Sequence, residues 1–81
     1  MTLDQLPRRQ LAIVHGVEDR GANDVIARRL RELGFVAGEQ VQMVTHGPLS
    51  AEPVLVQIGF TRFALRRAEA ARVRLVNGDA S

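Results

Sequence analysis

Residues 28–39 have the sequence RRLRELGFVAGE, and the hydrophobic period changes within them. Ile26, Leu30 and Leu33 recur at i, i+4 and i+7, which places them on one face of a helix. From Val41 onward, apolar and polar residues alternate as they do in a half-buried strand. The segment therefore predicts a helix that ends near residue 34 and a strand that follows it.

Two glycines separate the predicted helix from the predicted strand. Gly34 stands where a helix ends with a residue at positive φ, which glycine adopts without a steric penalty. Phe35 then folds back onto Leu30, the apolar contact that accompanies such a cap. Gly38 marks a tight turn. We therefore interpret these glycines, together with Leu30 and Leu33, as a structural motif and not as a functional site.

The predicted helix has a charged face opposite its apolar stripe. Asn23 or Asp24 is the expected N-terminal cap. Asp24 with Arg28, and Arg28 with Glu32, are opposite charges at i, i+4 and are expected to pair. The apolar stripe consists of Ala22, Ile26, Leu30 and Leu33.

Length and composition narrow the classes of function. A chain of 81 residues forms one small domain, with little room for a deep active-site cleft. The absence of cysteine excludes disulfides and Cys-type zinc sites, and no apolar run reaches the roughly 20 residues that cross a bilayer. No phosphate-binding glycine loop, nucleophile elbow or His-Glu-x-x-His helix occurs. We predict a soluble, cytoplasmic protein that is not an enzyme and has no cofactor.

The chain predicts a mostly β (α+β) fold. Five short antiparallel strands, with one helix between the first and second, suggest a bent sheet closed into a partial barrel. The first strand is apolar on both faces, with Leu11 and Ile13 on one and Ala12 and Val14 on the other, so we expect it to be central or covered by the helix. The strands are expected at residues 11–17, 39–46, 54–58, 62–66 and 72–76.

The remaining segments are shorter. Leu3 and Leu6 are expected to pack down from an N-terminal arm or helical turn. The expected connections are a loop at 46–53, a hairpin turn at 59–61 and one helical turn at 67–71. The domain is predicted to span residues 1–76, followed by a disordered tail at 77–81.

Several segments together resemble the ferrous iron transport protein A family. Residues 29–39 resemble the family's R-L-x-E-L-G-hydrophobic-x-x-G segment. Downstream, Glu52-Pro53-Val54, Ala64-Leu65-Arg66 and Glu69-Ala70 also resemble that family. The resemblance extends over residues 3–76.

This resemblance implies an SH3-like fold and an accessory role in ferrous iron uptake. Family members are small cytosolic proteins that support the ferrous iron permease, ferrous iron transport protein B, a membrane protein with a GTP-binding domain. The implied location is peripheral to the inner membrane, through the permease. Activation of GTP hydrolysis and assembly of the permease are both open as modes of action. The chain is expected to be a monomer or a weak homodimer.

Three residues are candidates for partner binding. Phe60 lies in the predicted hairpin turn, where it either contacts a partner or folds back over the barrel. Leu49 is a second apolar residue in a predicted loop. Arg62 follows the turn, and it or Arg67 is a candidate for an arginine supplied to a GTPase. A nucleic-acid-binding barrel is the alternative from another class, although the net charge is only +2 and Tyr and Trp are absent.

No metal site is predicted. The histidines, His15 and His46, match no ligand motif, and Glu52 is the nearest carboxylate in sequence to His46. An oxygen and nitrogen site would need these histidines together with Glu18, Asp19 or Glu52, and nothing in their spacing supports one.

Overall fold

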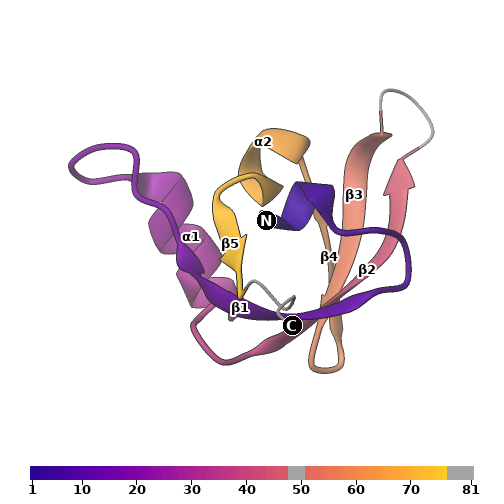
Figure 1. Ribbon diagram of the computed structural model, residues 1–81. Coiled ribbons are helices and arrows are strands. Elements are labelled where there is room, and N and C mark those ends of the chain that lie inside the picture. The colour runs from indigo at the N-terminus through magenta and orange to yellow at the C-terminus, as the bar shows by residue number, and fades with distance from the viewer. Residues whose placement is uncertain (48–50, 77–81) are drawn as a thin grey trace.

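One antiparallel sheet of five strands carries the fold, in the order β4-β3-β2-β1-β5 (Figure 1). The computed structural model describes residues 1–47 and 51–76. The predicted mostly β fold, with five antiparallel strands and a helix after the first, is confirmed. The elements are η1 (Leu3–Gln5), β1 (Leu11–Val17), α1 (Val25–Leu33), β2 (Gln40–Gly47), β3 (Ala51–Ile58), β4 (Thr61–Leu65), α2 (Arg67–Ala70) and β5 (Val73–Leu75).

Both ends of α1 are capped. Asp24 is the N-cap, and its side chain accepts a hydrogen bond from the backbone N–H of Ala27 at 3.1 Å. Gly34 has φ 116°, the left-handed conformation predicted for it. The N–H of Phe35 then donates to the carbonyl of Leu30 at 3.1 Å, and the Phe35 ring is completely buried. The helix therefore ends where the sequence predicts.

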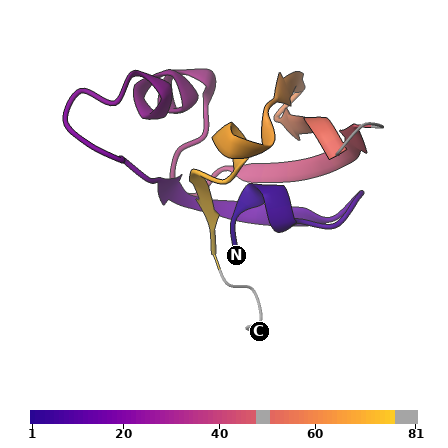
Figure 2. The same ribbon diagram turned by 90° about the horizontal axis from the view of Figure 1, so that it is seen from above.

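The hydrophobic core lies on the inner side of the bent sheet, where η1 and α2 cover it (Figures 1 and 2). The rings of Phe35 and Phe63 meet there at 5.9 Å between centroids, inclined by 55°, which is a favourable aromatic geometry. Leu3 and Leu6 pack down as predicted. The core consists of Leu3, Leu6, Val14, Leu30, Phe35, Val41, Met43, Val54, Val56, Ile58, Leu65, Ala70, Val73 and Leu75.

The predicted apolar stripe of α1 is partly wrong. Ala22 and Ile26 are exposed, whereas Ala27 and Leu30 are the buried residues of the helix. The helix lies beside the end of the sheet and not across it (Figure 2), so the body of the protein covers only a narrow strip of its surface. Leu33 is half-buried against the core.

Of the two alternatives predicted for β1, a central strand or one covered by the helix, the structure confirms the first. The strand is internal, between β2 and β5, but Leu11 is 57% exposed and Ile13 is 38% exposed. Val14 points into the core, and no helix covers the opposite face, because α1 packs at the end of the sheet. The outer face of the sheet is therefore open to solvent here.

The predicted loop at 46–53 is too long. β2 continues to Gly47 and β3 begins at Ala51, and the pairing between them is irregular between Thr45 and Gly47. Pro53 is tolerated within β3 because the regular ladder is interrupted beside it. The predictions for Leu49 and for the tail at 77–81 concern positions outside the described residues.

We predict that Gly47→Ala destabilises the fold by about 3 kcal/mol or more, because overpacking against backbone cannot relax through a side-chain movement. A Cβ atom at Gly47 would lie 2.0 Å from the carbonyl oxygen of Glu52. Gly16→Ala is the matched control, since a Cβ there has no atom within 4 Å. Urea unfolding of both variants measures the difference, and equal stabilities would contradict the close approach at Gly47.

Candidate interaction surface

An ion pair between Asp24 and Arg72 joins the start of α1 to the segment before β5. The two side chains are only 8% and 15% exposed. The Asp24 carboxylate also accepts from the backbone N–H groups of Arg20, at 2.9 Å, and Ala27, at 3.1 Å. The hydrogen bond from Arg72 is the main cause that holds the pKa of Asp24 far below its usual range. Asp24 is therefore paired across the fold, and not with Arg28 as the helix periodicity suggested.

Two further contacts use acidic side chains on the same side of the molecule. Arg31 donates two hydrogen bonds to Asp19, at 2.7 and 3.2 Å, and this contact raises the pKa of Arg31. Glu18 accepts from Arg74 at 3.0 Å and from Arg20 at 3.1 Å. Arg74 first, and then Arg20, lower the pKa of Glu18. The ion pairs of the described residues thus gather around β1, α1 and β5.

Three other arginines form what we call the arginine patch, consisting of Arg8, Arg9 and Arg62. They line one open hollow on the outer side of the sheet together with Gln42, Val44 and Thr45. Within residues 1–47 and 51–76, none of the three pairs with a carboxylate. Arg62 instead donates from Nε to Oε1 of Gln57 at 2.9 Å. The patch is therefore positive and unneutralised by that part of the chain.

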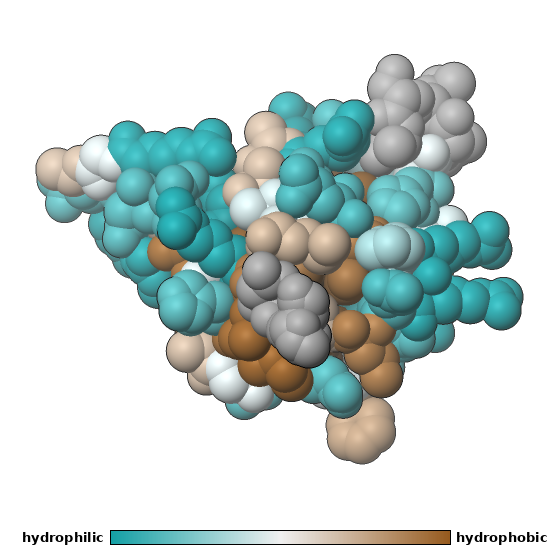
Figure 3. All heavy atoms as spheres, viewed as in Figure 1, coloured by the Kyte–Doolittle hydropathy of each residue, from teal (hydrophilic) through white to brown (hydrophobic). Residues whose placement is uncertain are grey.

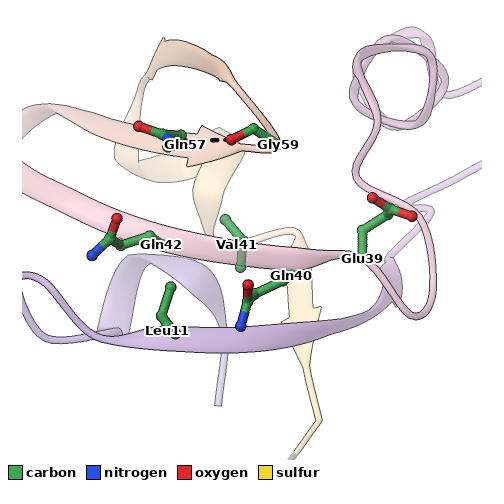
Figure 4. Close-up of a pocket in the computed structure, with 7 residues that line it drawn as sticks. All are labelled: Leu11, Glu39, Gln40, Val41, Gln42, Gln57 and Gly59. Carbon is green, nitrogen blue, oxygen red and sulfur yellow. Dashed lines mark hydrogen bonds between the residues drawn. The ribbon is translucent and has the colours of Figure 1, made fainter.

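A row of side chains crosses four strands on the outer face of the sheet. The register pairs Leu11 with Gln42, Gln42 with Gln57, and Gln57 with Arg62. Figure 4 shows the shallow hollow beside this row, where Gln57 donates to the carbonyl of Gly59 at 3.0 Å. Its volume is about 190 Å³, below the 300–1,000 Å³ of typical small-molecule sites. The geometry favours contact with a surface over enclosure of a substrate.

Phe60 occupies the turn between β3 and β4, with Gly59 at φ 60° beside it. Its side chain is completely exposed, so it does not fold back over the barrel. Figure 1 shows this turn projecting at the lower edge of the molecule. We call the combination of Phe60 with the row Leu11, Gln42, Gln57 and Arg62 the hairpin surface.

The residues named as metal candidates lie on three strands. His15 is exposed on β1, His46 is half-buried on β2 and Glu52 is exposed on β3. In the part of the chain that the structure describes, no three His, Asp or Glu side chains gather as a metal site would require. Among the same residues, no helix has the length and apolar character to cross a membrane.

The sequence reasoning found Phe60 and Arg62 but missed their neighbours. The sequence predicts that the strand containing Leu11 is central or covered by the helix; the strand is central, but Leu11 is 57% exposed. The sequence gives no signal that distinguishes Arg8 and Arg9 from the other arginines. The glutamines were visible as the polar positions of alternating strands, Gln40 and Gln42 in one and Gln57 in the next. Only the register shows that β1 to β4 bring these positions into one row.

A strongly bent five-stranded sheet with one inserted helix and an open outer face defines a small SH3-like domain. A family model for the FeoA domain matches residues 1–77. The chain belongs to the FeoA family.

Individual relatives agree with this assignment. FeoA of Stenotrophomonas maltophilia, solved in complex with zinc and described as an SH3 domain protein, is 60% identical with a TM-score of 0.89, over 96% of this chain and 92% of that one. Iron(II) transport protein A of Clostridium thermocellum is 30% identical with a TM-score of 0.80, over 96% and 46% of the two chains. A fusion of Fe(2+) transport protein A with the Fe(2+) transporter FeoB, from Porphyromonas gingivalis, is 35% identical over 83 residues. The chain spans 9% of that relative's length.

We predict that Asp24→Asn weakens the fall in stability at acid pH. Because the pKa of Asp24 is lower in the folded protein than its ordinary value of 3.8, the ionised carboxylate contributes stability above that value and loses it as the pH falls further. Asparagine still caps a helix but does not ionise. Thermal unfolding from neutral pH to about pH 2 measures the effect.

Glu32→Gln is the control for this experiment. Glu32 lies on the same helix, and its carboxylate forms no ion pair with the described residues. If the stability of Asp24→Asn falls as steeply with decreasing pH as that of the unaltered protein, the ion pair between Asp24 and Arg72 does not stabilise the fold.

Proposed function

We propose that this domain is an accessory protein of ferrous iron uptake that binds the cytoplasmic part of the membrane ferrous iron transporter through the hairpin surface. The observation that carries the proposal is the fusion of a homologous domain with FeoB in Porphyromonas gingivalis. Joining two modules in one chain raises their effective concentration, which benefits modules that act together. We propose that the same two kinds of module make contact in the system to which this domain belongs.

The hairpin surface has the composition of a binding site. An exposed phenylalanine at a turn contributes nothing to the core, whereas aromatic side chains and arginine dominate the binding energy of interfaces. Arg62 lies two positions beyond Phe60, and its hydrogen bond to Gln57 restrains the guanidinium. The neighbouring glutamines add uncharged donors and acceptors that a partner can satisfy with hydrogen bonds.

Two other functions receive less support. Nucleic-acid binding is less supported because the net charge is only +2 and the chain has no Tyr or Trp on which bases could stack. A direct role in GTP hydrolysis requires an arginine that reaches the nucleotide, and Arg62 is the candidate because its terminal nitrogens make no bond to the described residues.

The proposal also places the domain in the cytoplasm, at the membrane through its partner, as a monomer or a weak dimer.

We predict that Phe60→Ser lowers the affinity for the isolated cytoplasmic part of the transporter by about tenfold or more, because the central aromatic contact is lost. The unfolding temperature stays nearly unchanged, since the ring is fully exposed. Val25→Ser is the matched control, an apolar side chain 66% exposed at the start of α1. Binding by titration calorimetry tests both, and equal affinities for the two variants would reject the hairpin surface as the docking site.

If the domain docks on the transporter without supplying a catalytic arginine, Arg62→Lys leaves the rate of GTP hydrolysis by the transporter unchanged. The comparison is made with the domain at saturating concentration. Lysine keeps the charge but lacks the planar fork with which arginine stabilises a transferring phosphoryl group. Hydrolysis rates of the intact transporter, with and without the variant, give the answer. A loss of stimulation of about a thousandfold with binding intact would instead make Arg62 a catalytic residue.

A further inference from the structure

The arginine patch joins residues that are far apart in the sequence. Arg8 and Arg9 precede β1, and Arg62 lies on β4 at the edge of the sheet. All three side chains are exposed. The patch therefore exists only in the folded chain.

The segment that carries Arg8 and Arg9 is fixed by its backbone. The N–H of Arg9 donates to the carbonyl of Met43 at 2.6 Å, and its carbonyl accepts from Nε2 of Gln42 at 3.2 Å. The N–H of Met43 returns a bond to the carbonyl of Gln10 at 3.1 Å. The two guanidinium groups thus extend from an ordered segment, while their own side chains make no hydrogen bond with the described residues.

The patch has no internal counter-charge. The residues that line its hollow include three arginines and no acid. The carboxylates of Glu18, Asp19 and Asp24 are occupied on the other side of the fold. Grouped like charges repel each other and contribute nothing to folding here, so their grouping points to an external anion.

We propose that the arginine patch binds the anionic phospholipid surface of the membrane and so orients the domain beside the transporter. The surface around it is open and not a groove, which suits a plane of headgroups better than an extended peptide. Figure 3 shows hydrophilic side chains projecting at the right edge of the view and an apolar group projecting below, where Figure 1 has the β3–β4 turn.

This membrane contact depends on the proposed function in one respect only: the proposed function locates the domain at a membrane. The contact is weak by itself, since each arginine near an anionic surface strengthens binding about fivefold. A weak contact is sufficient for a domain that a transporter already holds at the membrane, because the second binding event is then intramolecular.

Sedimentation with vesicles tests the proposal without the transporter. The complete chain is mixed with vesicles of equal parts phosphatidylglycerol and phosphatidylcholine, and with vesicles of phosphatidylcholine alone. We expect binding to the anionic vesicles only, with loss of binding as salt is added. We expect the double variant Arg8→Gln/Arg9→Gln to lower the partition coefficient of the protein on the anionic vesicles by about 25-fold, because each arginine contributes about fivefold.

The double variant Arg28→Gln/Arg29→Gln is the matched control. It removes the same charge from two consecutive exposed arginines on α1, which form no ion pair with the described residues. We expect it to bind the anionic vesicles nearly as well as the unaltered protein. An equal loss in both double variants would show that net charge alone attracts the protein, and would overturn the assignment to the patch.

If the protein binds neither the anionic nor the phosphatidylcholine vesicles, the proposal is also overturned. If Arg8→Gln/Arg9→Gln then weakens binding to the transporter's cytoplasmic part, the patch recognises an acidic segment of that protein. Phe60→Ser binding to the transporter is measured separately, so failure of the membrane contact and failure of the docking surface are distinguishable.

Discussion

The left-handed conformation of Gly34 is the constraint on which the remaining structure depends. It ends α1, and the following N–H bonds back to the carbonyl of Leu30. That bond places Phe35 in the centre of the core, against Phe63 of β4. From there the chain passes through Gly38, at φ 94°, into β2. The helix and the sheet are therefore connected through one buried aromatic residue, whose position follows from a backbone angle that glycine adopts readily.

Charge is distributed unevenly over this small fold. Acidic side chains near α1 and β5 bind four of the arginines, and the ion pair of Asp24 with Arg72 is the most buried of them. These contacts tie the loop before α1 to the end of the chain. The outer face beside β4 receives no such compensation and keeps Arg8, Arg9 and Arg62 available. One side of the domain thus uses arginine in ion pairs within the fold, and the other leaves arginine exposed to solvent.

The open outer face follows from the placement of α1, the longest helix among the described residues. A helix lying across the sheet would have covered Leu11 and Ile13 and left no room for a partner. Because α1 lies beside the end of the sheet, the row from Leu11 to Arg62 stays accessible, and the β3–β4 turn exposes Phe60 at its end. The hollow beside this row is shallow, which favours recognition of a surface.

The sequence alone determined the local structure: the helix and its cap, the five strands, a hairpin turn at 59–61, which the structure shortens to Gly59 and Phe60, and the family resemblance. These features depend on neighbours along the chain, where periodicity and glycine conformations are informative. Tertiary structure decided the exposure of Leu11 and Ile26, the pairing of Asp24 with Arg72, the strand pairing around Pro53 and the grouping of Arg8 and Arg9 with Arg62. Each of these depends on strand register and helix placement, which bring together residues that are distant in sequence.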